Sequence, residues 1–131
     1  MKLMIACIAA AGLLLALQPP PRGQDLFARR CSGCHALDIN KEGPRLRGVY
    51  GRRAASIADF DYSDSLKKAG GTWDSVTLDR WLTDPDAFAA GTDMAFRMID
   101  ESERRAVIEY LRTLSTSETA PGLRPSRQMA H

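Results

Sequence analysis

The residues Cys31-Ser32-Gly33-Cys34-His35 decide how the rest of this chain is interpreted, because they place two thiols and an imidazole in one short segment. When the backbone is helical, two residues between the thiols match the separation of two neighbouring haem vinyl groups, and the histidine that follows reaches the iron from the same side. Gly33 leaves room for the macrocycle against the backbone. The segment therefore predicts one covalent haem c, bound through Cys31 and Cys34, with His35 as a ligand of the iron.

Three other kinds of site use two cysteines at this spacing. A thiol oxidoreductase places the pair at a strand-to-helix turn, whereas no strand pattern precedes Cys31. A structural zinc site needs four ligands, and beyond residue 23 the chain offers two cysteines, His35 and the terminal His131. A plain disulfide leaves His35 unexplained. The haem site is favoured, and these three alternatives stay open at this point.

Residues 1–22 have the pattern of a secretory signal peptide followed by its junction. Lys2 precedes an apolar run at residues 3–17, and three prolines follow at residues 19–21. The run is shorter than the ~20 residues that span a bilayer, so we expect a cleaved signal and no stable membrane insertion. Cys7 precedes most of the apolar run, which is the wrong order for a lipid-modified cysteine. The pattern predicts export to a bacterial periplasm.

The composition fits one small globular domain. The chain has 131 residues, of which 44% are hydrophobic and 26% charged. Without residues 1–23 it would carry 16 basic and 16 acidic side chains, so nucleic acid is not an expected partner. A domain of this size buries little apolar surface by itself, and a haem would supply part of its core. A monomer is expected.

Hydrophobic periodicity along the chain predicts helices and gives no sign of strands. The clearest is the last helix, which Asp100 and Glu103 would cap and in which apolar residues recur at i, i+3, i+4 and i+7. The helices expected are residues 23–30, residues 65–69, residues 74–82 and the segment after Asp100 that carries Val107, Tyr110, Leu111 and Leu114. We therefore expect an all-α domain of three to five helices wrapped around one haem.

Long irregular connections join these helices. Glycines and Pro44 interrupt residues 36–62, and such a long loop in a compact domain needs a cofactor to order it. The pattern ends near Ser115, and the Ser-, Thr- and Pro-containing residues 116–131 are expected to form a disordered tail. The domain is then residues 23–115.

The opposite face of the iron needs a second ligand, for which the residues alone leave several candidates. These are His131, Met94, Met98 and Met129. Met94 is favoured, because it lies in an irregular segment between two expected helices, where a thioether can point inward. A lone methionine is more often a core residue than a ligand, so from spacing alone both interpretations of Met94 stay open.

Beyond the motif, a series of residues stands in an order that a chance Cys-x-x-Cys-His would not produce. The spacing holds without a gap from Gly43 to Phe96. The residues of the series are Gly23, Phe27, Gly43, Pro44, Leu46, Gly48, Gly51, Arg52, Phe60, Tyr62, Gly70, Trp73, Leu78, Leu82, Pro85, Gly91, Thr92, Met94, Phe96, Tyr110 and Leu111. This pattern resembles the class I cytochrome c family, close to its mitochondrial type and bacterial relatives, over residues 23–114.

The resemblance implies the small cytochrome c fold and roles for matching residues. It makes Met94 the axial ligand opposite His35, with the Pro44 carbonyl accepting the other ring N–H of the histidine. It groups four residues around the haem propionates, namely Arg52, Tyr62, Trp73 and Thr92. It also implies a contact between the first and last helices through Gly23, Phe27, Tyr110 and Leu111. For Phe27 and Phe96, ordinary core packing explains most of the match.

The sequence departs from the family where mitochondrial members present a ring of lysines around the haem edge. Several matching positions are acidic or neutral here, namely Asp86, Ala87, Asp93 and Asp100, while Arg29, Arg30 and Arg97 keep part of a positive patch. The partner therefore need not be the usual oxidase. Quinol–cytochrome c reductase, a terminal oxidase or a periplasmic dehydrogenase are the partners that the resemblance implies.

The function expected is that of a soluble monohaem electron carrier in a respiratory chain, and not of an enzyme. Two filled axial positions leave electron exchange through the haem edge as the remaining chemistry. A dedicated acceptor for one periplasmic dehydrogenase is the narrower version of this function. The alternative is a haem peroxidase or gas-binding sensor in which Met94 is displaced.

Overall fold

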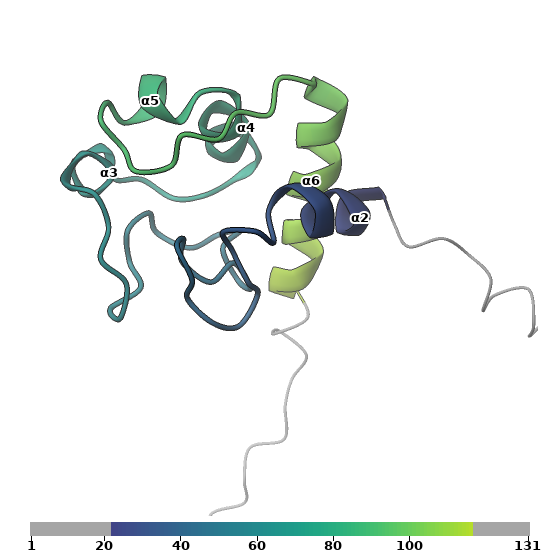
Figure 1. The fold of residues 1–131 in the computed structure, drawn as a ribbon, viewed down its shortest axis with the longest axis horizontal. Coiled ribbons are helices and arrows are strands. Elements are labelled where there is room, and N and C mark those ends of the chain that lie inside the picture. Colours follow the sequence, from purple (N-terminus) through teal and green to yellow (C-terminus); the bar gives the residue numbers. More distant parts are fainter. Residues whose placement is uncertain (1–21, 117–131) are drawn as a thin grey trace, which may run out of the picture.

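The computed structural model describes residues 22–116, which form five helices joined by irregular segments (Figure 1). The helices are α2 (Arg22–Arg30), α3 (Asp64–Ala69), α4 (Ser75–Thr83), α5 (Pro85–Phe88) and α6 (Glu101–Thr116). In this part of the chain no strand forms, and a single bridge joins Arg53 to Thr72. The expected all-α fold of three to five helices with long loops is confirmed.

The first and last described helices begin and end close to the bounds expected for the domain, which stay a prediction. Residue 22, the last of the expected leader, begins α2, and residue 116, the first of the expected tail, ends α6. The rest of both segments, with Cys7, Met129 and His131, lies outside the described residues. Between residues 22 and 116, no helix is both long and apolar enough to span a bilayer.

Side-chain caps set where the middle helices begin. Asp74 caps α4, because its carboxylate accepts hydrogen bonds from the backbone N–H groups of Val76 at 2.9 Å and Thr77 at 2.8 Å. The short helix α5 was not expected. It forms because Asp84 accepts a bond from the N–H of Ala87 and Pro85 occupies the first turn, where its missing N–H costs nothing.

The first and last helices pack against each other (Figure 1). A Cβ atom on Gly23 would lie 2.2 Å from the Ala106 carbonyl oxygen and 2.8 Å from Cβ of Tyr110, so only glycine allows this close approach. The rings of Phe27 and Tyr110 meet edge to face, with centroids 5.7 Å apart. The contact between first and last helices that the resemblance implies is present.

A buried arginine fixes the segment that leads from α5 into α6. The guanidinium of Arg104, which is 8% exposed, donates to a carboxylate oxygen of Asp79 on α4 at 2.7 Å and to the carbonyls of Met98 and Ile99 at 3.0 and 2.8 Å. The N–H of Met98 in turn donates to the Leu82 carbonyl at 2.7 Å. Residues 89–100 are thereby held along α4, where they form one wall of the site.

Candidate haem site

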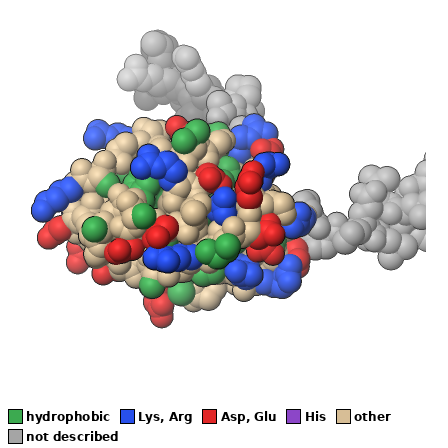
Figure 2. Space-filling view, turned by 90° about the horizontal axis from the view of Figure 1, so that it is seen from above, with side chains coloured by type: hydrophobic (Ala, Val, Ile, Leu, Met, Phe, Trp, Pro, Cys, Tyr) green, Lys and Arg blue, Asp and Glu red, His purple; other side chains and the backbone are tan. Residues whose placement is uncertain are grey.

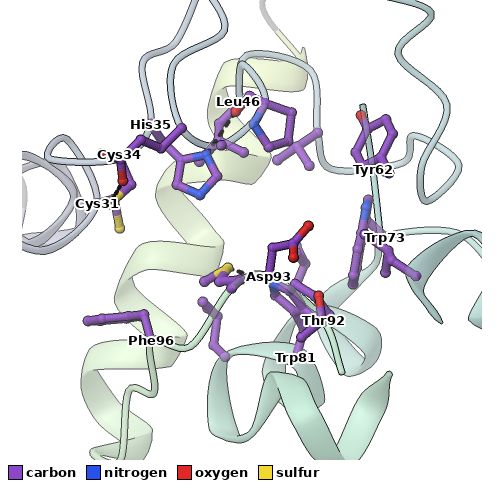
Figure 3. A pocket seen from close by; sticks show the side chains of 18 of the residues that line it. Cys31, Cys34, His35, Leu46, Tyr62, Trp73, Trp81, Thr92, Asp93 and Phe96 are labelled. Carbon is purple, nitrogen blue, oxygen red and sulfur yellow. Dashed lines mark hydrogen bonds between the residues drawn. The ribbon is translucent and has the colours of Figure 1, made fainter. Parts of the chain in front are cut away.

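The first wall of the site continues directly from α2. The N–H groups of Cys31 and Ser32 donate to the Phe27 carbonyl, and the N–H of His35 donates to the Cys31 carbonyl at 2.9 Å. The backbone therefore makes one further turn after the helix, and this turn carries both thiols and the imidazole. Cys31, Cys34 and His35 lie along the same side of the cavity, and the His35 ring points into it (Figure 3).

The state of His35 follows from its single hydrogen-bond partner. Its Nδ1 lies 2.8 Å from the Pro44 carbonyl oxygen. A carbonyl can only accept, so Nδ1 carries the proton and Nε2 keeps a free lone pair in the neutral ring. Burial lowers the pKa of His35, against the opposing effect of the Pro44 bond, and so favours this neutral form. A neutral imidazole with a free Nε2 is the form that binds iron.

Gly43 makes room for this ring. A Cβ atom at position 43 would lie 2.2 Å from Cε1 and 2.6 Å from Nδ1 of His35. Any larger residue would therefore displace the imidazole. The N–H of Gly43 also donates to the Cys34 carbonyl at 2.8 Å, which ties the loop to the cysteine turn.

The opposite wall presents the sulfur of Met94. The indole Nε1 of Trp81, on α4, donates to the Met94 sulfur at 3.2 Å. Trp81 and His35 lie on opposite sides of the cavity (Figure 3). An imidazole nitrogen and a thioether sulfur are therefore available from two sides of one space, which is a ligand pair that suits a haem iron.

The end of the cavity away from the cysteines is polar and aromatic, and Figure 3 shows Tyr62, Trp73 and Thr92 there. The Tyr62 hydroxyl accepts a bond from the Ile57 N–H at 3.3 Å, and the hydroxyl groups of Ser63 and Thr92 lie 3.5 Å apart. Arg52 is half-buried and also lines the cavity, where it brings a positive charge.

The cavity between these walls has a volume of about 470 Å³. Most of its surface comes from apolar side chains, among them Leu46, Leu66, Leu78, Val107 and Leu111. Because the cavity is open to solvent on one side, water would wet these apolar side chains when nothing is bound, and an apolar ligand would bury them. The lining therefore suits a large apolar occupant.

All nine residues predicted as haem contacts from the sequence line this one cavity. They are Cys31, Cys34, His35, Pro44, Arg52, Tyr62, Trp73, Thr92 and Met94. The residues present fit a haem: two thiols on one wall, a nitrogen and a sulfur on two sides, an apolar middle and a cation at the far end. The individual roles stay predictions.

The geometry gives little support to the other cysteine chemistries. Burial raises the pKa of the Cys31 thiol to about 11, and the hydrogen bond to Glu42 raises that of Cys34, so neither is activated as a thiolate nucleophile. The two cysteines are separate thiols. Within residues 22–116, no group of three or more His, Cys, Asp and Glu side chains could hold a metal ion.

Trp81 and Ser63 are site residues that sequence reasoning missed. Trp81 lies within the helix expected at residues 74–82 and packs there as a core residue, because its ring centroid lies 5.5 Å from that of Trp73 and 5.6 Å from that of Phe88. The signal that was available is the polar N–H of a tryptophan predicted to be buried, since such a group needs an acceptor. Ser63 carried no comparable signal.

Comparison with known proteins gives consistent results. A sequence model of the family described as cytochrome c matches residues 21–115. Cytochrome c2 iso-2 of Magnetospirillum molischianum is 44% identical over 87 residues, which cover 64% of this chain and 90% of that protein. Cytochrome c-type cyt cy of Rhodobacter capsulatus is 42% identical over 94 residues, which are 70% of this chain and 47% of the relative. The solved structure of cytochrome cH from Methylobacterium extorquens matches with a TM-score of 0.66 and 41% identity, over 70% of this chain and 95% of that one.

Proposed function

The chain belongs to the cytochrome c family, and from this premise we infer that it carries one covalent haem c and exchanges single electrons with other redox proteins. When bound, the haem supplies an iron that alternates between the ferrous and ferric states. The observation that carries the inference is the pair formed by the neutral His35 imidazole and the Met94 thioether, on two sides of one apolar cavity beside two cysteines. With these two residues bound to it, the iron would have no open position for a substrate.

The residues of the two walls have separate tasks in this proposal. Cys31 and Cys34 would form the two thioethers. His35 would bind the iron through Nε2, because Pro44 holds the proton on Nδ1 and fixes the plane of the ring. Met94 would bind from the other side, with its sulfur oriented by the Trp81 N–H.

The polar end of the cavity suits the propionate groups of a haem. Arg52 is the half-buried cation there, and its Nη2 donates to the Arg45 carbonyl at 3.0 Å, which holds the guanidinium in place. Tyr62, Trp73 and Thr92 add hydroxyl and indole donors to the same region. We therefore assign these four residues to propionate binding, where they would offset two buried carboxylates.

We further propose that the protein is a carrier and not an enzyme, and that it works in the periplasm. The apolar run and prolines within residues 1–22 support export, residues 23–115 would form the electron-transfer domain, and residues 116–131 would be a disordered tail. Its partners would be a quinol–cytochrome c reductase, a terminal oxidase or a periplasmic dehydrogenase.

Expression of the full chain in a bacterium that matures c-type cytochromes tests this function. The expected product is red, keeps the added mass of one haem after denaturation, and in the ferric state shows the weak band at the red end of the spectrum that reports methionine ligation. Met94→Leu should abolish that band and let the ferrous protein bind carbon monoxide. Met98→Leu is the matched control, because Met98 is fully buried on the same segment and does not line the cavity.

A colourless product, or loss of the haem mass on denaturation, would overturn the covalent haem. Rapid binding of carbon monoxide by the unmodified ferrous protein would overturn the Met94 assignment and the electron-carrier function with it.

A further inference from the structure

The cavity opens to solvent where its lining residues are exposed. Six lining residues are exposed, namely Arg30, Cys34, Glu42, Asp61, Asp93 and Ala95, and all others are half-buried or buried. Four of the six carry a formal charge. The opening is where an edge of the cofactor would be reached, so these charges decide what can approach it.

Acidic and basic side chains are interspersed on the face of the molecule that Figure 2 shows, so the charges around the opening are counted pair by pair. Arg30 lies 3.7 Å from Glu103, and its guanidinium covers the Phe96 ring at 5.6 Å. Arg97 is paired with Asp84 at 3.0 Å. Arg30 and Arg97 of the surviving positive patch therefore each have an acidic partner within the protein.

The remaining cations near the opening are also matched. The Nζ of Lys41 donates to the Ser32 carbonyl at 2.7 Å, and the acid Glu42 is its chain neighbour. Lys67 is shared by two acids, with its Nζ 3.7 Å from Asp61 and 3.8 Å from Asp64. Arg52 is turned inward, toward the Arg45 and Arg47 carbonyls.

An excess of acids is left, because Asp61 and Asp64 share the single Lys67. We call Asp61, Asp86 and Asp93 the acidic rim. Asp86 borders a second hollow together with Met94 and Arg97, and its carboxylate accepts a hydrogen bond from the Gly91 N–H at 2.9 Å. In the described part of the chain, no basic group lies within ion-pair distance of Asp86 or Asp93. Residues 22–116 carry 15 basic and 15 acidic side chains, so the negative rim is a local feature and not a reflection of net charge.

We propose that the acidic rim receives redox partners whose own docking face is cationic, the reverse of the polarity of the lysine-ringed family members. The proposal rests on the proposed electron-transfer function and adds the chemistry of the partner to it. Unpaired surface charges around an exposed redox edge steer the encounter and favour the partner of opposite sign, and salt screens this effect.

Oxidation of the ferrous holoprotein by two small oxidants of opposite charge tests the sign of the rim. The probes are tripositive tris(phenanthroline)cobalt(III) and trinegative hexacyanoferrate(III), each of which takes one electron from the ferrous iron. As ionic strength rises from about 0.01 M to 0.15 M, the rate with the cobalt complex should fall about twofold or more, and the rate with hexacyanoferrate should rise. A mitochondrial cytochrome c, which carries a ring of lysines, is the protein probe. The rate of electron exchange between the two proteins should fall as salt is added.

Variants locate the effect. Asp86→Asn combined with Asp93→Asn should flatten both salt dependences. Glu109→Gln is the control of equal sign, because Glu109 is an exposed acid of α6 paired with Arg112 and lies away from the cavity lining. If Glu109→Gln changes the salt dependence as much, for each charge removed, as the double variant of the rim does, then net charge and not the rim is responsible. The proposal would then be wrong.

The outcomes separate this proposal from the function on which it rests. If both probes react but the salt dependence is absent or has the opposite sign, the proposed cationic partner is wrong. The electron-carrier function would still stand. A holoprotein that exchanges no electron with either probe overturns the proposed function, and the docking proposal with it.

Discussion

The indole Nε1 of Trp81 donates a hydrogen bond to the sulfur of Met94 across 3.2 Å. An indole N–H can only donate, and a thioether sulfur is a weak acceptor with two lone pairs. The bond engages one lone pair and leaves the other free to face the cavity. Because Trp81 is only 8% exposed, no bulk water competes for its N–H. Trp81 is thus a positioning residue for the Met94 sulfur, although its place in α4 predicts only a core side chain.

Replacing Trp81 by Phe should lower the reduction potential. The hydrogen bond draws electron density from the sulfur and so disfavours the ferric state, and its loss removes that effect. A bond of about 0.5–1.5 kcal/mol corresponds, for one electron, to a fall of up to about 60 mV. A redox titration of the haem measures this fall in reduction potential. Phe88→Leu is the control, because Phe88 packs on the Trp81 ring at 5.6 Å without reaching the sulfur, and its potential should stay near that of the wild type.

Gly43→Ala should disrupt the binding of the iron by His35. The added Cβ would lie 2.2 Å from the ring, so either the imidazole or the loop must move. We expect a weakened or high-spin ferric spectrum and a lower denaturation midpoint. Ile39→Ala, on the same loop, is the matched substitution, since Ile39 is exposed and does not line the cavity. Equal effects of both substitutions would show that the space beside His35 is not the cause.

Gly23→Ala should destabilise the domain although alanine favours helices. The Cβ would meet the Ala106 carbonyl oxygen at 2.2 Å, which forces α2 and α6 apart. Overpacking of this kind costs about 1–3 kcal/mol, which outweighs the gain in helix propensity of up to about 1 kcal/mol. Urea denaturation measures the difference. Gln24→Ala, exposed on the same helix, should change the free energy of unfolding by no more than about 0.5 kcal/mol.

Asp74→Asn should change how stability depends on pH. Hydrogen bonds from the backbone and hydroxyl of Thr77 and from the Val76 N–H lower the pKa of Asp74. A carboxyl whose folded-state pKa is depressed adds stability above its unfolded pKa of about 4, and this is lost as pH falls through the folded value. Asparagine still caps the helix but does not titrate. The variant should therefore be less stable than the wild type at pH 7 and approach it in acid.

Denaturation midpoints between neutral pH and pH 2.5 check this prediction. Asp64→Asn serves as the comparison, because at the start of α3 Ser63 accepts the capping bond in place of the acid. A stability difference for Asp74→Asn that does not change with pH would contradict the linkage.

The sequence predicted most of the fold because its signals are local. Asp74 before an apolar face, the periodicity through Val107 and Leu111, and the helix leading into Cys31 each depend on neighbours within a few residues. Helix boundaries agreed to one or two residues for this reason. The short α5 was missed, because Pro85 is as typical of the segment after a helix as of the first turn of a new one.

The parts that the sequence did not predict depend on distant partners. Arg104 has no local feature that indicates burial, and its burial becomes possible only when Asp79 and two carbonyls meet it. The Trp81 bond needs a methionine 13 positions later to fold back over α4. Among the nine predicted cavity residues, Cys31, Cys34 and His35 came from a local motif, and Met94 was favoured by its place between two helices. The other five, Pro44, Arg52, Tyr62, Trp73 and Thr92, were found through a family pattern that records such distant contacts.

The packing of α2 against α6 sets an order of assembly. Arg22 and Ser102, which are joined by a 3.0 Å hydrogen bond, are 80 positions apart, so the first helix must wait for nearly the whole domain to be synthesised before its partner exists. Through that interval the adjoining cysteine turn stays accessible, and the Cys31 thiol lacks the burial that raises its pKa in the folded state. The turn that carries Cys31 and Cys34 is thus made early in the chain, and the helix that closes over it comes last.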